Sequence, residues 1–258
     1  MNNVNKTLYI PLYGKAYVSR LGILLYDPKA EEIWEQEGFP LKGKAKSKWL
    51  AYNMGMRSAV FDRWLEEQMN VLPDAVVLHV GCGMDSRCQR VGTRNHRWLD
   101  VDFPEVIAER KRYYTETEHY RMIGSDIRQT AWLAEIPKGS RAIIVMEGVS
   151  MYLPLEELNQ VLAAWQDHFS HISLLMDTYT TFAARATKYK NPINEVGVTE
   201  VFGFDTPDCI SGLRFVAEHS LTPEALIVQL KTSEQGFFRR MFAGKLAKKI
   251  YRLYEYQI

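Results

Sequence analysis

Short apolar runs alternate with helix-length segments through the middle of the chain. The apolar runs, which are typical of buried strands, occupy residues 75–81, 96–102, 120–126, 141–148 and 172–179. The longer segments between them suit helices and occupy residues 84–92, 103–117, 127–136 and 153–170. Strand–helix alternation of this kind indicates a parallel sheet covered by helices on both faces. We therefore expect an α/β fold built on a doubly wound sheet.

The end of the chain departs from this alternation. Residues 212–230 have the pattern of a strand followed by a helix, and residues 251–258 alternate as a strand. With these two strands the expected sheet has seven strands, mostly parallel, with an antiparallel C-terminal edge. Residues 234–250 form a basic amphipathic helix pattern. We expect this helix to pack on the sheet rather than to lie on a membrane surface, through Phe237, Phe238, Met241 and Leu246.

Helices are also expected ahead of the sheet. Residues 27–38 begin with Asp-Pro and end in glycine, which are helix start and stop signals. Apolar residues recur at helical spacing in residues 51–72. We expect one domain, residues 1–258, in which a helical cover (1–72) precedes an α/β core (73–258). The aromatic residues of the cover suit either a core or the wall of an acceptor cavity.

Composition and charge narrow the class of protein. The chain is 47% hydrophobic and 24% charged, as in ordinary globular proteins. It has 32 Lys and Arg residues and 31 Asp and Glu residues. This balance gives no excess of positive charge that would indicate binding to nucleic acid or to an anionic membrane. No stretch reaches the ~18 apolar residues of a membrane span, and the first ten residues lack a signal-peptide core, so we expect a cytoplasmic protein. Cys82, Cys88 and Cys209 fit no metal-ligand or disulfide spacing, and no metal site is expected.

Glycines and carboxylates follow the ends of the predicted strands, where open α/β sheets bind their ligands. Gly81 and Gly83 let the backbone turn tightly and approach a ligand. The dinucleotide fingerprint needs a third glycine where Ser86 stands. Asp102 ends the second strand, where a carboxylate accepts both hydroxyls of a ribose, and Asp126 ends the third, within reach of an adenine. Together these residues predict a pocket for an adenosine group but no binding site for the pyrophosphate of a dinucleotide.

Each of these residues also has a structural alternative. A lone Gly-x-Gly can be a plain turn, and Asp102 could cap the helix that starts at Pro104. Arg57 could pair with a surface carboxylate, or hold the carboxylate of an amino-acid tail on the adenosine. Glu147 closes an apolar strand, where a carboxylate is costly unless it is paired. The ammonium group of such a tail would give Glu147 a partner.

Four runs carry a family resemblance. "GCGMDSR", "LDVDFPEVIAERK", "GSDIRQTAWL" and "MEGVSMYLPLEEL" occur in this order. Together they resemble the S-adenosylmethionine-dependent leucine carboxyl methyltransferase family, which includes O-methyltransferases of polyketide biosynthesis. The resemblance covers about residues 8–180 and fades in the last third of the chain. It implies a Rossmann-like methyltransferase fold with S-adenosyl-L-methionine as cofactor.

The resemblance also implies roles for particular residues. Lys15 and Arg57 would hold the methionine carboxylate of the cofactor, and Glu147 would lie near its ammonium group. Gly81 and Gly83 would flank the methionine and ribose, and Asp102 would bind the ribose hydroxyls. Asp126 and Ile127 would border the adenine, and Tyr152 would lie near the transferred methyl group. His79 departs from the pattern, because many methyltransferases carry an acidic residue there.

The expected activity is methyl transfer to an oxygen atom of a small polyketide-like molecule, either a carboxylate or a phenolic hydroxyl. A sulfonium methyl is already activated, so the enzyme chiefly has to hold the acceptor in line with it. A carboxylate needs no general base, whereas a hydroxyl does, and no histidine lies in a motif that marks it as one. The alternatives are a protein C-terminal carboxyl methyltransferase, an NAD-dependent oxidoreductase and a non-catalytic cofactor-binding protein. The oligomeric state is left open.

Overall fold

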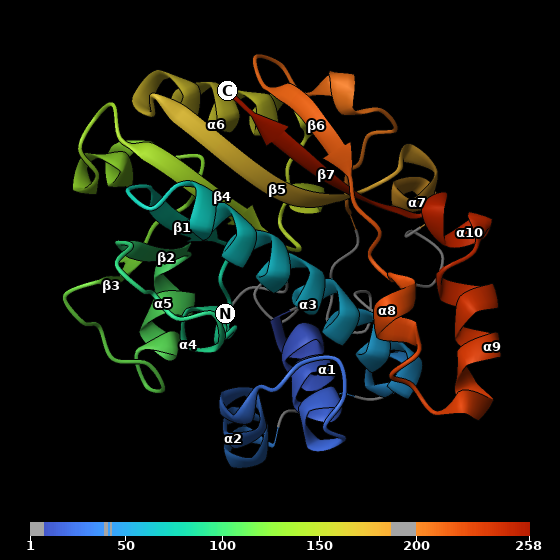
Figure 1. The fold of residues 1–258 in the computed structure, drawn as a ribbon. Coiled ribbons are helices and arrows are strands. Elements are labelled where there is room, and N and C mark those ends of the chain that lie inside the picture. The colour runs from blue at the N-terminus through green and yellow to red at the C-terminus, as the bar shows by residue number, and fades with distance from the viewer. Residues whose placement is uncertain (1–7, 39–40, 42, 187–199) are drawn as a thin grey trace.

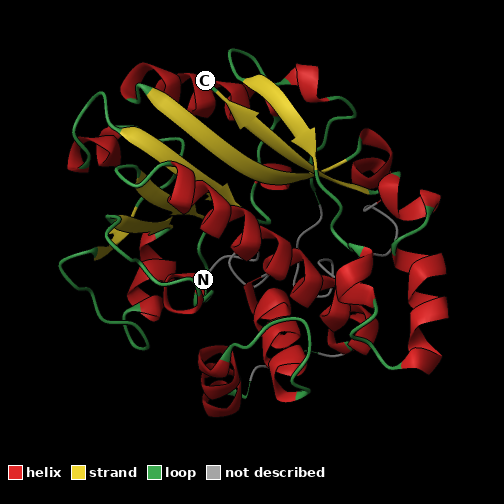
Figure 2. Ribbon diagram, viewed as in Figure 1, coloured by secondary structure: helices red, strands yellow, loops and turns green. Residues whose placement is uncertain are grey.

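One seven-stranded sheet forms the centre of the protein (Figures 1 and 2). The computed structural model describes residues 8–38, 41, 43–186 and 200–258. The strands are β1 Val76–Val80, β2 Trp98–Asp102, β3 Tyr120–Gly124, β4 Arg141–Met146, β5 His171–Tyr179, β6 Arg214–Glu218 and β7 Tyr251–Gln257. They lie in the order β3-β2-β1-β4-β5-β7-β6. The order reverses between β1 and β4, which is the switch point where such sheets bind ligands.

Strands β1 to β5 are parallel, as their apolar runs predicted. The C-terminal part differs in detail from the expectation. Strand β7 runs antiparallel to both β5 and β6, so it lies inside the sheet, and β6 forms the edge. Successive side chains of β7 point to opposite faces of the sheet, and both faces are buried. Leu253 packs in the core on one face, and Tyr254 and Tyr256 pack in the core on the other. A strand with buried apolar residues on both faces suits a position inside the sheet.

Helices cover both faces of the sheet. Helix α3 (Lys48–Val71) crosses one face in Figure 1, and α6 (Leu155–His168) lies against the other. Phe61 and Leu65 of α3 pack on β1 and β4, together with α5 (Pro104–Arg110). On the opposite face the core is built by Leu162 and Trp165 of α6. The long apolar runs of β1 and β4 follow from this, because strands covered on both sides have no exposed face.

Helices α2 (Pro28–Glu37) and α3 confirm the two N-terminal helices predicted from the sequence, whereas α1 (Tyr9–Arg20) was not predicted. Helix α1 precedes α2, whose N-cap Asp27 accepts a hydrogen bond from the Ala30 amide at 2.9 Å. Gly38 ends α2 with a φ of 56°, a conformation that favours glycine. Residues 1–7, 39–40 and 42 of the expected cover lie outside the described residues.

Three expected helices are shorter than predicted. Where residues 103–117 were expected to form a helix, α5 ends at Arg110. Residues 127–136 contain only the 3-10 helix η3 (Ala131–Glu135). Pro137 follows directly and forces Ile136 into an extended conformation, which ends the helix. In the glycine loop region, α4 spans only Arg87–Arg90.

The basic C-terminal helix is also broken and packs elsewhere than expected. Helix α8 (Glu224–Ile227) is followed by α9 (Thr232–Phe242), α10 (Lys245–Lys248) and then β7. Phe238 is buried against α1 and α3 rather than against the sheet, because these helices offer an apolar surface containing Val18 and Met56. Phe237 and Met241 remain 48% and 45% exposed, and the side chain of Leu246 lies outside the described residues.

The remaining short elements are α7 (Thr181–Ala186) and the 3-10 helices η2 (Gly43–Lys46), η4 (Ser150–Tyr152) and η7 (Pro207–Cys209). Among the described helices, none combines the length and the apolar character that a membrane span requires.

Candidate functional site

A cavity of about 730 Å³ lies at the carboxyl ends of β1, β2, β3 and β4. Every site residue predicted from the sequence borders it: Lys15, Arg57, Gly81, Gly83, Asp102, Asp126, Ile127, Glu147 and Tyr152. The helical cover supplies Lys15 from α1 and Arg57 from α3, η4 supplies Tyr152, and the strand ends with the loops that follow them supply the others. The fold therefore brings together residues that are as much as 137 positions apart, from 15 to 152.

The glycine loop is shaped by backbone geometry that favours glycine. Gly81 and Gly83 have φ values of 66° and 50°. A Cβ on Gly81 would lie 2.1 Å from Cγ2 of Val149, far inside van der Waals contact. The Gly81 amide donates to the carbonyl of Val101 at 2.8 Å, which ties the loop to β2. The loop is thus a fixed part of the cavity wall rather than a plain surface turn.

Asp102 ends β2 and faces the glycine loop. Its carboxylate accepts hydrogen bonds from the amides of Gly83 at 2.8 Å and Phe103 at 2.7 Å. Phe103 is the N-cap residue of α5, so neither amide belongs to the helix itself, and these two hydrogen bonds tie Asp102 to the glycine loop and to the residue before the helix. Burial raises the pKa of Asp102 to about 6 although both amides oppose the shift.

Asp126 and Ile127 form the part of the cavity next to β3. Asp126 pairs with Arg128, whose Nε lies 3.0 Å from each carboxylate oxygen, and this hydrogen bonding lowers the pKa of Asp126. Ile127 packs against the sheet core beside α6. The two residues give this end of the cavity one charged and one apolar wall.

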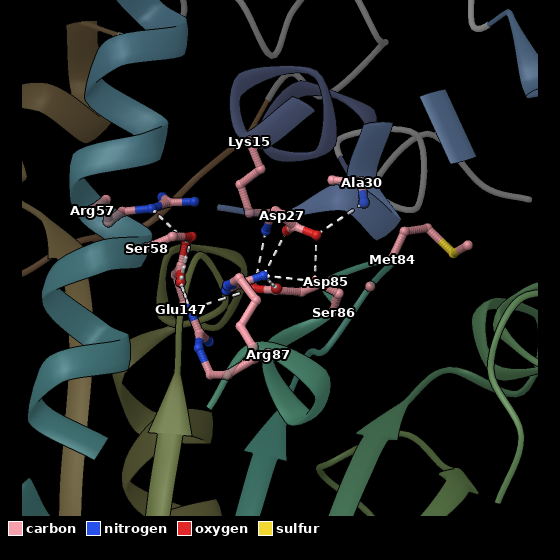
Figure 3. Close-up of polar contacts among 12 residues, drawn as sticks. Lys15, Asp27, Ala30, Arg57, Ser58, Met84, Asp85, Ser86, Arg87 and Glu147 are labelled. Carbon is pink, nitrogen blue, oxygen red and sulfur yellow. Dashed lines mark hydrogen bonds and ion pairs between the residues drawn. The ribbon is translucent and has the colours of Figure 1, made fainter. Parts of the chain in front are cut away.

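A buried ionic cluster forms the opposite end (Figure 3). Arg57 Nε donates to Glu147 at 2.9 Å, and the hydroxyl of Ser58 donates to the same carboxylate at 3.1 Å. Arg87 also contacts Glu147, and Lys15 pairs with Asp85 at 3.0 Å. Burial would raise the pKa of Glu147, but the charges of Arg57 and Arg87 outweigh it and lower the pKa to about 2. Glu147 is therefore the paired carboxylate that its apolar strand required.

Arg87 and Arg90 are part of this cluster but were not predicted from the sequence. Arg87 is fully buried and donates to Asp62 at 2.6 Å. Arg90 bridges three carboxylates, those of Asp27, Asp62 and Asp85, at 2.6 to 2.8 Å. In the sequence both arginines look like the exposed charges of a short helix, and no local signal marks them as buried.

His79 occupies the position where the family pattern led us to expect an acid. It is buried near the carboxyl end of β1, and Nε2 lies 3.0 Å from Nη1 of Arg87. Its Nδ1 lies 3.3 Å from Asp100. Burial and then the charge of Arg87 lower the pKa of His79, which favours a neutral imidazole. His79 thus lies between Arg87 and Asp100.

The rest of the cavity is apolar. This lining includes residues of α3, of η4 and of the segment leading into β7, among them Leu50, Met54, Met151, Met241, Phe242 and Ile250. Tyr251, at the start of β7, also borders the cavity and was missed from the sequence. Among the described residues, no group of three or more His, Cys, Asp or Glu side chains is arranged to hold a metal ion.

The sheet order, the glycine loop and the carboxylate at the end of β2 define a nucleotide-type binding fold of the Rossmann-like class. Comparison with known proteins gives its family. Residues 13–166, more than half of the chain, match the model of the leucine carboxyl methyltransferase family. The chain belongs to this family and is a methyltransferase, as its four motifs predicted.

Individual relatives agree with this assignment. The chain is 29% identical over 241 residues to the tetracenomycin polyketide synthesis O-methyltransferase TcmP of Streptomyces glaucescens, covering 91% of this chain and 89% of that one. Magnesium protoporphyrin IX methyltransferase from Synechocystis PCC 6803, solved with bound SAH, aligns with a TM-score of 0.53 at 12% identity, covering 89% of this chain and 92% of that one. Geranyl diphosphate methyltransferase, solved in complex with SAM, aligns with a TM-score of 0.54 at 15% identity, covering 85% of this chain and 92% of that one. The structural matches confirm the expected fold.

Proposed function

We propose that this methyltransferase moves the methyl group of S-adenosyl-L-methionine to an oxygen atom of a small-molecule acceptor, either a carboxylate or a phenolic hydroxyl. The cavity carries the proposal, because its polar and charged lining residues suit the cofactor and the apolar residues of the same cavity suit an acceptor. Its volume of about 730 Å³ lies in the usual range for small-molecule sites. The polyketide O-methyltransferase named above supports an acceptor of this kind.

The polar and charged lining residues fit the cofactor. The glycine loop leaves no side chain between the backbone and a ligand, and Asp102 offers a buried carboxylate to the ribose hydroxyls. Arg57 and Glu147 present opposite charges for the carboxylate and the ammonium group of the amino-acid tail. Asp126 and Ile127 would border the adenine. We further propose that residues 1–72 cover the core at 73–258 within one domain, since Lys15 and Arg57 complete a cavity made mostly by the core.

When bound, the cofactor supplies a sulfonium methyl group that is already activated for displacement. The chain then has to place the acceptor oxygen in line with that methyl group and to keep water away. Tyr152 borders the cavity and would position the acceptor. Met54, Met241 and Phe242 would hold its apolar body, because flexible methionine side chains adapt to irregular ligands.

The test is methyl transfer from isotope-labelled S-adenosylmethionine to a panel of phenols, aromatic carboxylic acids and a peptide with a free C-terminal carboxylate. We expect the label on a phenol or a carboxylic acid, detected by mass spectrometry. Mild base distinguishes the products, because it hydrolyses a methyl ester but leaves an aryl methyl ether intact.

Three outcomes would contradict this proposal. Label only on the peptide would show the protein C-terminal activity instead. Cofactor binding without label on any acceptor would favour a non-catalytic binding protein. Saturable NADH binding without binding of S-adenosylmethionine would revive an oxidoreductase.

A further inference from the structure

We propose that Tyr251 and Asp177 are positioning residues that hold Arg57 ready for the carboxylate of the cofactor's amino-acid tail. The inference rests on the proposed function, which supplies that carboxylate. It assigns to the C-terminal strand β7 a part in binding the cofactor's amino-acid tail. This strand lies outside residues 13–166, which match the family model.

The contacts among the three side chains are short and buried. Nη1 of Arg57 donates to the hydroxyl oxygen of Tyr251 at 2.8 Å. That hydroxyl donates in turn to Oδ2 of Asp177 at 2.7 Å, and the same oxygen lies 3.3 Å from Nη1. The side chain of Asp177 is 0% exposed, and its Oδ1 accepts from the Gly148 amide at 2.7 Å. Asp177 is therefore fixed to the backbone beside the cavity and holds the tyrosine hydroxyl in place.

These contacts leave one edge of the guanidinium group available. Nε is used by Glu147 and Nη1 by Tyr251. Nη2 has no hydrogen-bond partner within the described part of the chain, and it lies beside Gly148, where an added Cβ would be 3.6 Å away. Arg57 and Gly148 both border the cavity. A planar guanidinium held at two nitrogens keeps its remaining donors in a fixed direction, which favours a charge-assisted hydrogen bond to a carboxylate.

Sheet topology brings these residues together. Strand β7 pairs with β5 in a register that sets Tyr251 opposite Tyr179, and the two rings lie edge to face at 5.1 Å. Asp177 is two residues before Tyr179 on β5. Because β7 lies antiparallel to β5 and next to it, the hydroxyl of Tyr251 contacts Arg57, which is 194 positions earlier in the chain.

The test compares two ligands in the variant Tyr251→Phe, which removes only the hydroxyl. S-adenosylhomocysteine carries the amino-acid carboxylate, whereas 5′-methylthioadenosine has the same adenosine and thioether without it. We expect Kd for S-adenosylhomocysteine, measured by calorimetry, to rise about tenfold, the size of effect expected when a hydrogen bond to a charged group is lost. Kd for 5′-methylthioadenosine should stay the same.

Two further variants make the comparison sharp. Tyr254→Phe is the matched control, because this tyrosine lies on the same strand and its hydroxyl donates to the carbonyl of Asp205 at 3.3 Å, away from the cavity lining. It should leave both affinities unchanged. Asp177→Asn weakens the support of the hydroxyl without removing a ring, and it should show the same selective loss if Tyr251→Phe does not fold.

An equal loss of affinity for both ligands would overturn the proposal, because it would show a general structural role. Unchanged affinity for S-adenosylhomocysteine in both variants would overturn it as well. In either case the wild-type protein still binds both ligands, and the proposed function stands. Failure of the wild-type protein to bind either ligand would instead overturn the proposed function together with this inference.

Discussion

Asp102 and Glu147 are two carboxylates in one cavity that are held in different electrostatic environments. Both are buried, but Glu147 lies against Arg57 and Arg87, and its pKa falls to about 2. Asp102 accepts hydrogen bonds only from neutral amides, and its pKa rises to about 6 because burial outweighs them. Near neutral pH, Glu147 is therefore ionised with a wide margin, whereas Asp102 is close to its titration range.

This difference predicts a pH dependence of cofactor binding. In the proposed role of Asp102 the ribose hydroxyls would donate to its ionised form, so binding should weaken as the pH falls through about 6. By calorimetry, Kd for S-adenosylhomocysteine should be constant from pH 7 to 8 and rise toward tenfold per pH unit below about 6. Asp102→Asn should bind more weakly at pH 8 and lose this slope.

The variant Asp102→Asn also distinguishes the titration of Asp102 from that of His79. His79 is a second buried group near the ends of β1 and β2 that could titrate in this range. The pKa of His79 is lowered by burial and by Arg87. A slope that persists in Asp102→Asn would assign the titration to another group and would contradict the ribose role of Asp102.

At the scale of elements, the loop between β1 and α4 decides whether the polar part of the cavity can form. The turn needs a positive φ at Gly81, and it also needs the space that a side chain would take from Val149. These are two separate requirements, and another glycine of the protein meets only the first. Gly139 has a φ of 85° in the turn before β4, but nothing lies within 4 Å of an added Cβ.

Gly81→Ala and Gly139→Ala therefore form a matched pair. Both should lose about 1–2 kcal/mol of unfolding free energy from the left-handed backbone conformation. Gly81→Ala must also displace Val149 or the loop, so we expect a larger drop in Tm and a loss of S-adenosylhomocysteine binding. Gly139→Ala should bind normally. Equal effects of the two variants in thermal melts and calorimetry would show that the close approach at Gly81 is unimportant.

At the scale of the whole molecule, the cavity joins segments from both ends of the chain. Lys15 comes from α1, Arg57 from α3 and Tyr251 from β7, while the central strands supply the glycines and carboxylates. The core is shared in the same way, since Leu12, Phe61 and Val145 belong to one buried cluster. A ligand in the cavity therefore contacts segments that all have to be folded at once.

Ligand binding should accordingly stabilise the protein as one unit. At a free concentration 100 times Kd, S-adenosylhomocysteine should add about 2.7 kcal/mol to the free energy of unfolding. For a chain of this size that corresponds to an increase in Tm of about 5–10 °C, measurable by scanning calorimetry as a single shifted transition. Asp102→Asn at the same ligand concentration should show a smaller shift. A ligand-dependent shift confined to part of a split transition would contradict the coupling.

The amino-acid sequence by itself determined the central sheet and most of the candidate site. Buried parallel strands leave long apolar runs, and ligands bind where such runs end, so Gly81, Asp102 and Glu147 could be located from local pattern. Helix α2 was equally visible from its Asp-Pro start and its closing glycine, but α1 was not. The position of β7 inside the sheet, rather than at its edge, was not visible, because strand order depends on packing between distant segments.

Only the tertiary structure decided how the charges are paired. Arg57 meets Glu147 across 90 positions of sequence and Tyr251 across 194. Arg87 lies in a short helix whose local pattern is that of a surface element, yet it is fully buried. Local periodicity reports which face of an element is apolar, but it carries no information about which distant charge will compensate a buried one. The strand ends of the site therefore follow from sequence, and the ionic cluster that holds them follows from the fold.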